Sequence, residues 1–234
     1  ALVQGNQIRE YVKWDDQPGS VAAIPESLLR AYRIAVTEPQ GPVYVCFDVD
    51  LQEEALPNGF ALPDVSRYRP AAPPEPDRGA LREAARLLVQ AELPLCFADR
   101  VGGSADAVRT LVELAELLAM PVIDLGARWS FPTPHELDFA GMQNDLLRKA
   151  DVILGLDVVD MAGALKLPVD YTTRQAAKPE VENQQVISVS LDELIHRGAT
   201  TDFQGLPEVD VPILANAATT LPLLIEEVRR LLDG

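Results

Sequence analysis

From residue 77 onward, the apolar residues of the chain follow two alternating patterns. Stretches with apolar residues three and four positions apart predict amphipathic helices, and the short continuous apolar runs between them predict strands buried on both faces. The predicted helices follow Asp77 and Ser104, span residues 144–150, and end the chain with a stripe from Leu221 to Leu231; the predicted strands are 94–98, 121–125, 152–156, 185–189 and 211–215. This alternation predicts an α/β fold, with a Rossmann-like three-layer parallel sheet over residues 77–234.

The first part of the chain predicts a helix followed by a single strand. Pro25 suits a first helical turn, and the turn signal at residues 39–42 leads into the apolar run 42–49. A buried parallel strand needs neighbours, yet only about forty residues precede this one. We therefore expect the strand to have fewer ladder partners than its apolar character requires.

A proline-rich segment separates these two regions. Residues 53–76 are rich in proline and show no apolar period, which is typical of an extended linker. The predicted organisation is therefore a helix–strand remnant of another α/β domain at 1–52, a linker at 53–76 and the Rossmann-like domain at 77–234.

Composition and charge exclude several classes of function. The net charge of −16 and the scattered basic residues argue against a nucleic-acid partner, because phosphate binding needs clustered Lys and Arg. No apolar run reaches the length of a membrane span, and the N-terminal sequence has no secretory signal. Cys46 and Cys96 both lie in apolar runs, which favours buried thiols over a disulfide. We expect a cytoplasmic protein that binds neither nucleic acid nor membrane.

A possible nucleotide site follows the first strand of the Rossmann-like domain. Gly102, Gly103 and Ser104 lie between that strand and a helix N-terminus, where free N–H groups and the helix dipole favour an anion. Asp124, at the end of the next strand, lies about where the ribose-binding acid of a dinucleotide fold is found. The alternative is a glycine turn with a serine cap and no ligand.

Other candidate residues point to structural roles. His135 lies in a long loop after a strand, where it could brace the loop or act as a base, and His196 lies near a helix end. The acidic pairs Asp15/Asp16 and Asp48/Asp50 lack a third ligand at metal-binding spacing. The sequence contains no G-x-S-x-G, P-loop, H-E-x-x-H or C-x-x-C motif, so it shows no catalytic set.

The order of several short motifs resembles a known enzyme family. LLRAYRIA, GPVYV and DLQ, within residues 28–52, resemble the end of the pyrimidine-binding domain of thiamine-diphosphate-dependent enzymes of the acetohydroxyacid synthase and benzoylformate decarboxylase group. LAELLAMPV, at residues 114–122, and the loop with Phe131-Pro132, His135, Phe139 and Gly141 resemble the central domain of the same family.

This resemblance implies a parent enzyme that decarboxylates 2-oxo acids or related carbonyl compounds, or cleaves or joins C–C bonds in them. In the family, the catalytic Glu lies before the region matched by residue 1, and the G-D-G motif that binds Mg²⁺ and the diphosphate lies after the region matched by residue 234. The resemblance therefore implies a homo-oligomeric parent, a dimer or tetramer, with thiamine diphosphate and Mg²⁺ bound by its other domains, and a chain that is inactive alone.

Two alternatives remain open on the sequence. Some relatives bind FAD or ADP in the central domain, so the chain could be a nucleotide-binding module, although residues 99–101 read Asp-Arg-Val where the FAD-binding members have Gly-x-Gly. The chain could also be a non-catalytic interaction domain that reuses the fold.

Overall fold

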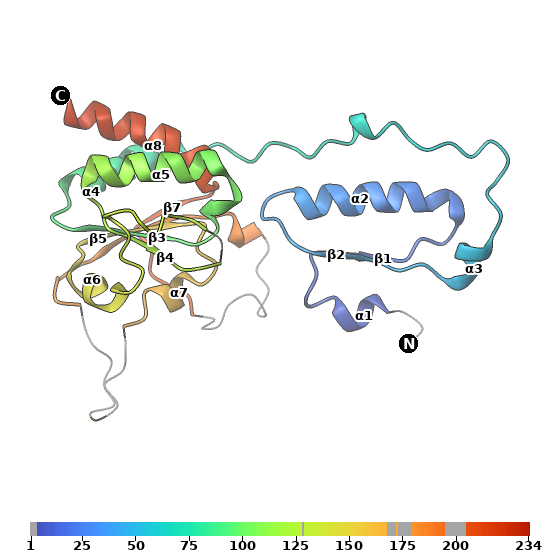
Figure 1. Cartoon of the computed structure of the whole chain (residues 1–234), viewed down its shortest axis with the longest axis horizontal. Helices are drawn as coiled ribbons and strands as arrows, with labels where there is room; N and C mark the ends of the chain where they lie inside the picture. The colour runs from blue at the N-terminus through green and yellow to red at the C-terminus, as the bar shows by residue number, and fades with distance from the viewer. Residues whose placement is uncertain (1–3, 128, 168–171, 173–178, 195–204) are drawn as a thin grey trace. The chain divides into compact units, whose positions relative to one another are not determined.

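The structure is a computed structural model that describes residues 4–127, 129–167, 172, 179–194 and 205–234 (Figure 1). The chain divides into two compact units. Unit 1 contains the described residues up to Pro73 together with Leu194, and unit 2 contains Pro74–Glu193 and residues 205–234. The division lies inside the predicted linker 53–76.

Unit 2 is built on a five-stranded sheet in which every pair of neighbouring strands is parallel. The strands run in the order β4-β3-β5-β6-β7. Three of them have the predicted bounds and two are shorter than predicted: β3 (Pro94–Ala98), β4 (Val122–Asp124), β5 (Val152–Leu156), β6 (Gln185–Val189) and β7 (Val211–Ile213). The predicted Rossmann-like parallel sheet is therefore confirmed.

Helices cover both faces of this sheet (Figure 1). One layer consists of α4 (Arg78–Gln90), α5 (Ala105–Leu118) and α8 (Ala217–Leu232), and the other of α6 (Gln143–Lys149) and α7 (Met161–Ala164). Alternate side chains of β3 enter the two cores, Cys96 and Ala98 on one face, Leu95 and Phe97 on the other. The predicted caps are also present, because the Asp77 side chain accepts from Ala80 N and that of Ser104 accepts from Ala107 N.

Unit 1 is a smaller piece of α/β structure. It contains α1 (Gly5–Ile8), β1 (Trp14–Asp16), α2 (Ile24–Val36), β2 (Val43–Val45) and α3 (Val49–Glu53). Short 3₁₀ turns complete the elements of the two units, at Val21–Ala23, Val65–Arg67, Val101–Gly103 and Asp192–Leu194. Strand β1 was not predicted, because two of its three residues are acidic and give it no apolar pattern.

Strand β2 has one neighbour among the described residues. It pairs in parallel with β1 alone, and it covers three residues of the predicted run 42–49. The expectation of too few ladder partners is confirmed for this part of the chain. Of the described apolar residues in unit 1, only Val21 and Ala31 are assigned to the buried core, which is small for a sheet that must exclude water.

No helix in the described ranges is long and apolar enough to cross a lipid bilayer.

The Lys13 side chain caps the C-terminal end of α2. Its ammonium group donates to the carbonyl oxygens of Ile34, at 2.7 Å, and Thr37, two acceptors that the helix itself leaves unpaired. Partial burial lowers the pKa of Lys13 by desolvation. A cation at this end also interacts favourably with the helix dipole.

Replacing Lys13 with Met removes both hydrogen bonds and the charge while keeping the aliphatic stem. We expect a loss of about 1 kcal/mol in the unfolding free energy of unit 1. Urea titration followed by tryptophan fluorescence measures it, because Trp14 is half-buried in β1 whereas Trp129 is already 84% exposed. Lys149→Met, at an exposed lysine in the last turn of α6, is the control and should change stability by no more than about 0.5 kcal/mol. Equal effects of the two substitutions would contradict the role of Lys13.

Candidate functional site

The carboxyl edge of the unit 2 sheet includes the point at which the strand order reverses. Numbered within unit 2, the strand order is 2-1-3-4-5, so the first and third strands, β3 and β5, are neighbours. The chain leaves β3 towards α5 and leaves β5 towards α7, and these two helices lie on opposite faces (Figure 1). In open α/β sheets, ligands are usually bound outside the carboxyl ends of the strands at such a reversal.

Gly102, Gly103 and Ser104 lie at this edge, in the 3₁₀ turn after β3 and at the N-cap of α5. Their N–H groups donate within the protein: Gly102 to Ser130 Oγ at 3.3 Å, Gly103 to Arg100 O at 3.1 Å and Ser104 to Val101 O at 3.1 Å. The Ser104 hydroxyl accepts from Ala107 N. These groups are therefore already used, so a phosphate would have to compete for them.

Gly102 is required by packing. A Cβ atom at this position would overlap the backbone carbonyl of Trp129, whereas a Cβ on Gly103 would meet no atom within 4 Å. The first glycine lets the loop after β4 approach the turn after β3, and the second is not constrained in this way.

Asp124 organises its own loop. Its carboxylate accepts from Gly126 N at 2.8 Å, from Ser130 N at 2.8 Å and from Phe131 N at 3.2 Å. A carboxylate with three backbone donors fixes the loop after β4 against the turn that holds Gly102. The structure thus brings Asp124 and the glycine turn to one edge, as predicted, and the nucleotide site itself stays a prediction.

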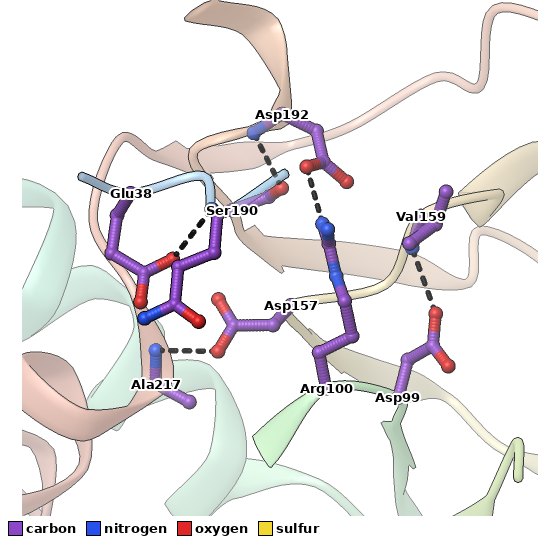
Figure 2. Close-up of polar contacts among 9 residues, drawn as sticks. Glu38, Asp99, Arg100, Asp157, Val159, Ser190, Asp192 and Ala217 are labelled. Atoms are coloured by element: carbon purple, nitrogen blue, oxygen red, sulfur yellow. Dashed lines mark hydrogen bonds and ion pairs between the residues drawn. The ribbon is translucent and has the colours of Figure 1, made fainter. Parts of the chain in front are cut away.

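Asp99 connects the loops that follow β3 and β5. It follows β3, is only 6% exposed, and accepts from Val159 N, in the loop after β5, at 3.0 Å (Figure 2). Desolvation raises the pKa of Asp99, while its bonds to backbone N–H groups and the positive charge of Arg100 oppose the rise. The Asp99 backbone carbonyl accepts from the buried hydroxyl of Ser130 at 2.7 Å.

Two further contacts tie neighbouring loops at the same edge (Figure 2). Asp157, after β5, accepts from Ala217 N, the first residue of α8, at 3.0 Å. The Arg100 guanidinium forms a partly buried ion pair with Asp192, after β6. No sequence pattern predicted these contacts of Asp157 and Asp192, although each is an acid that follows closely on a predicted strand.

The other residues considered from sequence have ordinary structural contacts. His135 braces its loop: its Nδ1 accepts from Leu137 N at 3.1 Å, its Nε2 lies 3.3 Å from Glu116 Oε1, and its ring packs edge-on against Phe131. His196 lies outside the described residues. Cys46 and Cys96 are free thiols.

The acidic pairs of unit 1 also contact protein groups. Asp15 forms a bidentate pair with Arg9, Asp16 accepts from the Ser27 hydroxyl, and Asp48 accepts from Gln17. Within the described ranges, no group of three or more His, Cys, Asp or Glu could hold a metal ion.

Gly102→Ala tests whether the turn after β3 depends on packing. We expect the substitution to lower the unfolding free energy by about 1 to 3 kcal/mol, because the Trp129 backbone would have to move. Gly103→Ala, at the neighbouring position, is the matched control and should change stability by no more than about 0.5 kcal/mol. Urea unfolding followed by circular dichroism distinguishes them; equal losses would contradict the packing role of Gly102.

Asp99→Ala removes the acceptor of Val159 N and should cost about 1 to 3 kcal/mol. Asp99→Asn keeps an acceptor oxygen there and should cost less. Because the folded-state pKa of Asp99 is raised, the stability that Asp99 contributes is fully present below its ordinary pKa of 3.8 and declines as pH rises through the raised value. The stability advantage of wild type over Asp99→Ala should therefore shrink as the pH rises above 3.8. An advantage that grows as the pH rises above 3.8 would contradict the assignment.

No protein-family model matches the chain, but several curated proteins and solved structures are similar to it. The chain is 27% identical over 215 residues to the acetolactate synthase large subunit of Corynebacterium glutamicum, and 30% identical over 210 residues to the glyoxylate carboligase of Escherichia coli O157:H7. Each match covers 88% of this chain but only 32% and 33%, respectively, of the relative. The chain thus spans about a third of the length of these curated relatives.

Solved structures give the same fold. Benzoylformate decarboxylase from Polynucleobacter necessarius matches with a TM-score of 0.65 at 21% identity, over 93% of this chain and 38% of that one. A putative thiamin diphosphate-dependent enzyme from Mycobacterium smegmatis matches with a TM-score of 0.64, over 93% of this chain and 40% of that one. The resemblance to thiamine-diphosphate-dependent enzymes that the motif order predicted is therefore confirmed over most of the chain.

Proposed function

We propose that the chain is part of a thiamine-diphosphate-dependent enzyme that acts on 2-oxo acids or related carbonyl compounds, by decarboxylation, C–C cleavage or carboligation. One observation carries the proposal: curated relatives named acetolactate synthase and glyoxylate carboligase match 88% of the chain in sequence. The likeness in fold to benzoylformate decarboxylase is consistent with it.

Within that enzyme, we assign a structural role to this chain. Residues 77–234 form the central domain, residues 53–76 a linker, and residues 1–52 the end of the pyrimidine-binding domain. The large two-sided core of unit 2 supports an independent domain, and the single partner of β2 with the small core of unit 1 supports a remnant. The partners are then the remaining domains of the parent and further copies in a cytoplasmic dimer or tetramer.

The cofactor chemistry belongs to those other domains in this proposal. When bound, thiamine diphosphate supplies a carbanion centre that attacks and later releases carbonyl carbon. The part that this proposal gives to the present chain is to hold the neighbouring domains at a fixed spacing.

The test compares the 234-residue chain with the product of the whole reading frame that encodes it. Calorimetry with thiamine diphosphate and Mg²⁺ should show saturable binding to the whole product and none to the chain alone. Consumption of pyruvate, glyoxylate or benzoylformate should likewise occur only with the whole product and should stop when the cofactor is omitted. A whole product that binds no thiamine diphosphate, or turnover by the chain alone, would refute the proposal.

A further inference from the structure

A cavity of ≈ 1210 Å³ lies within unit 1, between helix α2 and residues 60–68. This volume is enough for a small organic molecule. The residues that line the cavity all belong to unit 1, and the proposed function gives them no role. An inference about this cavity therefore does not depend on the proposed enzyme activity.

The cavity has apolar walls on two sides. Helix α2 contributes Pro25, Leu29 and Ile34, and the later segment contributes Phe60 and Tyr68. Leu29, Ile34 and Phe60 are only half-buried, so they leave apolar surface uncovered. Covering this surface with the apolar body of a ligand would be favourable. Apolar walls with a few polar groups are typical of sites for small organic molecules.

Basic residues outnumber acidic ones in the lining. The basic residues are Lys13, Arg30 and Arg33, and the acidic ones are Glu26 and Glu38, which leaves one positive charge in excess. The whole chain, by contrast, has a net charge of −16. A positive lining in an acidic protein favours an anionic ligand over a cationic one.

Arg33 is the basic residue of the lining whose charge is available. Arg30 pairs with Glu26, one turn earlier in α2, at 2.5 Å. Lys13 donates to two carbonyl groups at the end of α2, and its charge offsets the negative end of the helix dipole, which would otherwise repel an anion. The Arg33 guanidinium, in the last turn of α2, is exposed and forms no ion pair or hydrogen bond with the described residues.

We propose that this cavity binds a small amphipathic carboxylate, with its apolar body against Leu29 and Phe60 and its carboxylate paired with Arg33. The planar guanidinium offers two parallel N–H donors to the two carboxylate oxygens. One available cation matches a single negative charge. Glu26 and Glu38, in the same lining, would repel the additional charge of a diphosphate.

The experiment titrates the whole chain with the fluorescent probe anilinonaphthalene sulfonate, which joins an aromatic body to a single negative charge. Phenylnaphthylamine, which has the same aromatic body and no charge, is the matched probe. We expect one saturable site for the anionic probe, with a dissociation constant on the order of 10 to 100 µM. Arg33→Met keeps the aliphatic stem and removes the charge. It should weaken the anionic probe about threefold to tenfold and the uncharged probe by less than about twofold.

Displacement of the anionic probe tests the class of ligand. Phenylbutyrate should displace it from the wild-type protein, whereas phenylbutyramide, the uncharged amide, should require a concentration about threefold to tenfold higher. On Arg33→Met, the acid and the amide should displace the probe equally well. At constant ionic strength, ADP should displace it less than phenylbutyrate does.

Two further variants make the result specific. Arg82→Met removes an exposed arginine of α4 that lies outside the cavity lining, so it changes the net charge as Arg33→Met does and should leave the binding of both probes unchanged. Phe60→Ala removes part of an apolar wall and should weaken both probes, by about threefold or more. Circular dichroism checks the fold of each variant; Arg33 and Arg82 are both exposed, so neither substitution should change the melting temperature by more than about 2 °C.

The proposal is overturned if the anionic probe binds without saturation, or if Arg33→Met binds it as tightly as Arg82→Met does. Equal displacement by phenylbutyrate and its amide on the wild-type protein would also overturn it, as would stronger displacement by ADP. If Phe60→Ala does not fold, the comparison of Arg33→Met with Arg82→Met decides alone.

Discussion

The unit 2 fold depends on how its backbone donors at one edge of the sheet are satisfied. A parallel sheet with antiparallel covering helices brings the carboxyl ends of the strands and the N-termini of the helices to the same side. Unpaired N–H groups accumulate there, and a buried donor without an acceptor is costly. In this protein, acidic side chains at or just after the strand ends supply the acceptors: Asp99, Asp124 and Asp157 each accept from at least one N–H group of a loop or helix. The edge is thus held together by carboxylate contacts between segments that are distant in sequence.

The two units differ in how completely their strands are paired with neighbours and covered by apolar side chains. In unit 2, β3 and β5 have neighbours on both sides and apolar layers on both faces. In unit 1, β1 and β2 each have one neighbour among the described residues, and few apolar side chains are buried. The chain spans only about a third of the length of its curated relatives.

The sequence predicted the elements whose signal is local. The bounds of β3, β5 and β6, and the caps at Asp77 and Ser104, follow from continuous apolar runs and from side chains that cap within three residues. The candidate site was only partly predictable. Gly102 and Asp124 lie at the carboxyl edge of the sheet, where the sequence placed them. Their contacts could not be predicted, because Trp129, Ser130 and Phe131 belong to a loop without apolar periodicity. The contacts of Asp157 and Asp192 depend on strand order, which no local pattern encodes.

Strand β3 has a consequence for synthesis of the chain. Its five residues, Pro94–Ala98, are all buried, and it pairs on one side with β4 and on the other with β5. During synthesis, β4 follows β3 after helix α5, and β5 is made only after the long loop and α6 that follow β4. Until then, one edge of this fully buried strand stays unpaired in the nascent chain. This interval is when the growing protein is most exposed to aggregation, and the acidic charge of the chain, −16 overall, opposes such association by repulsion.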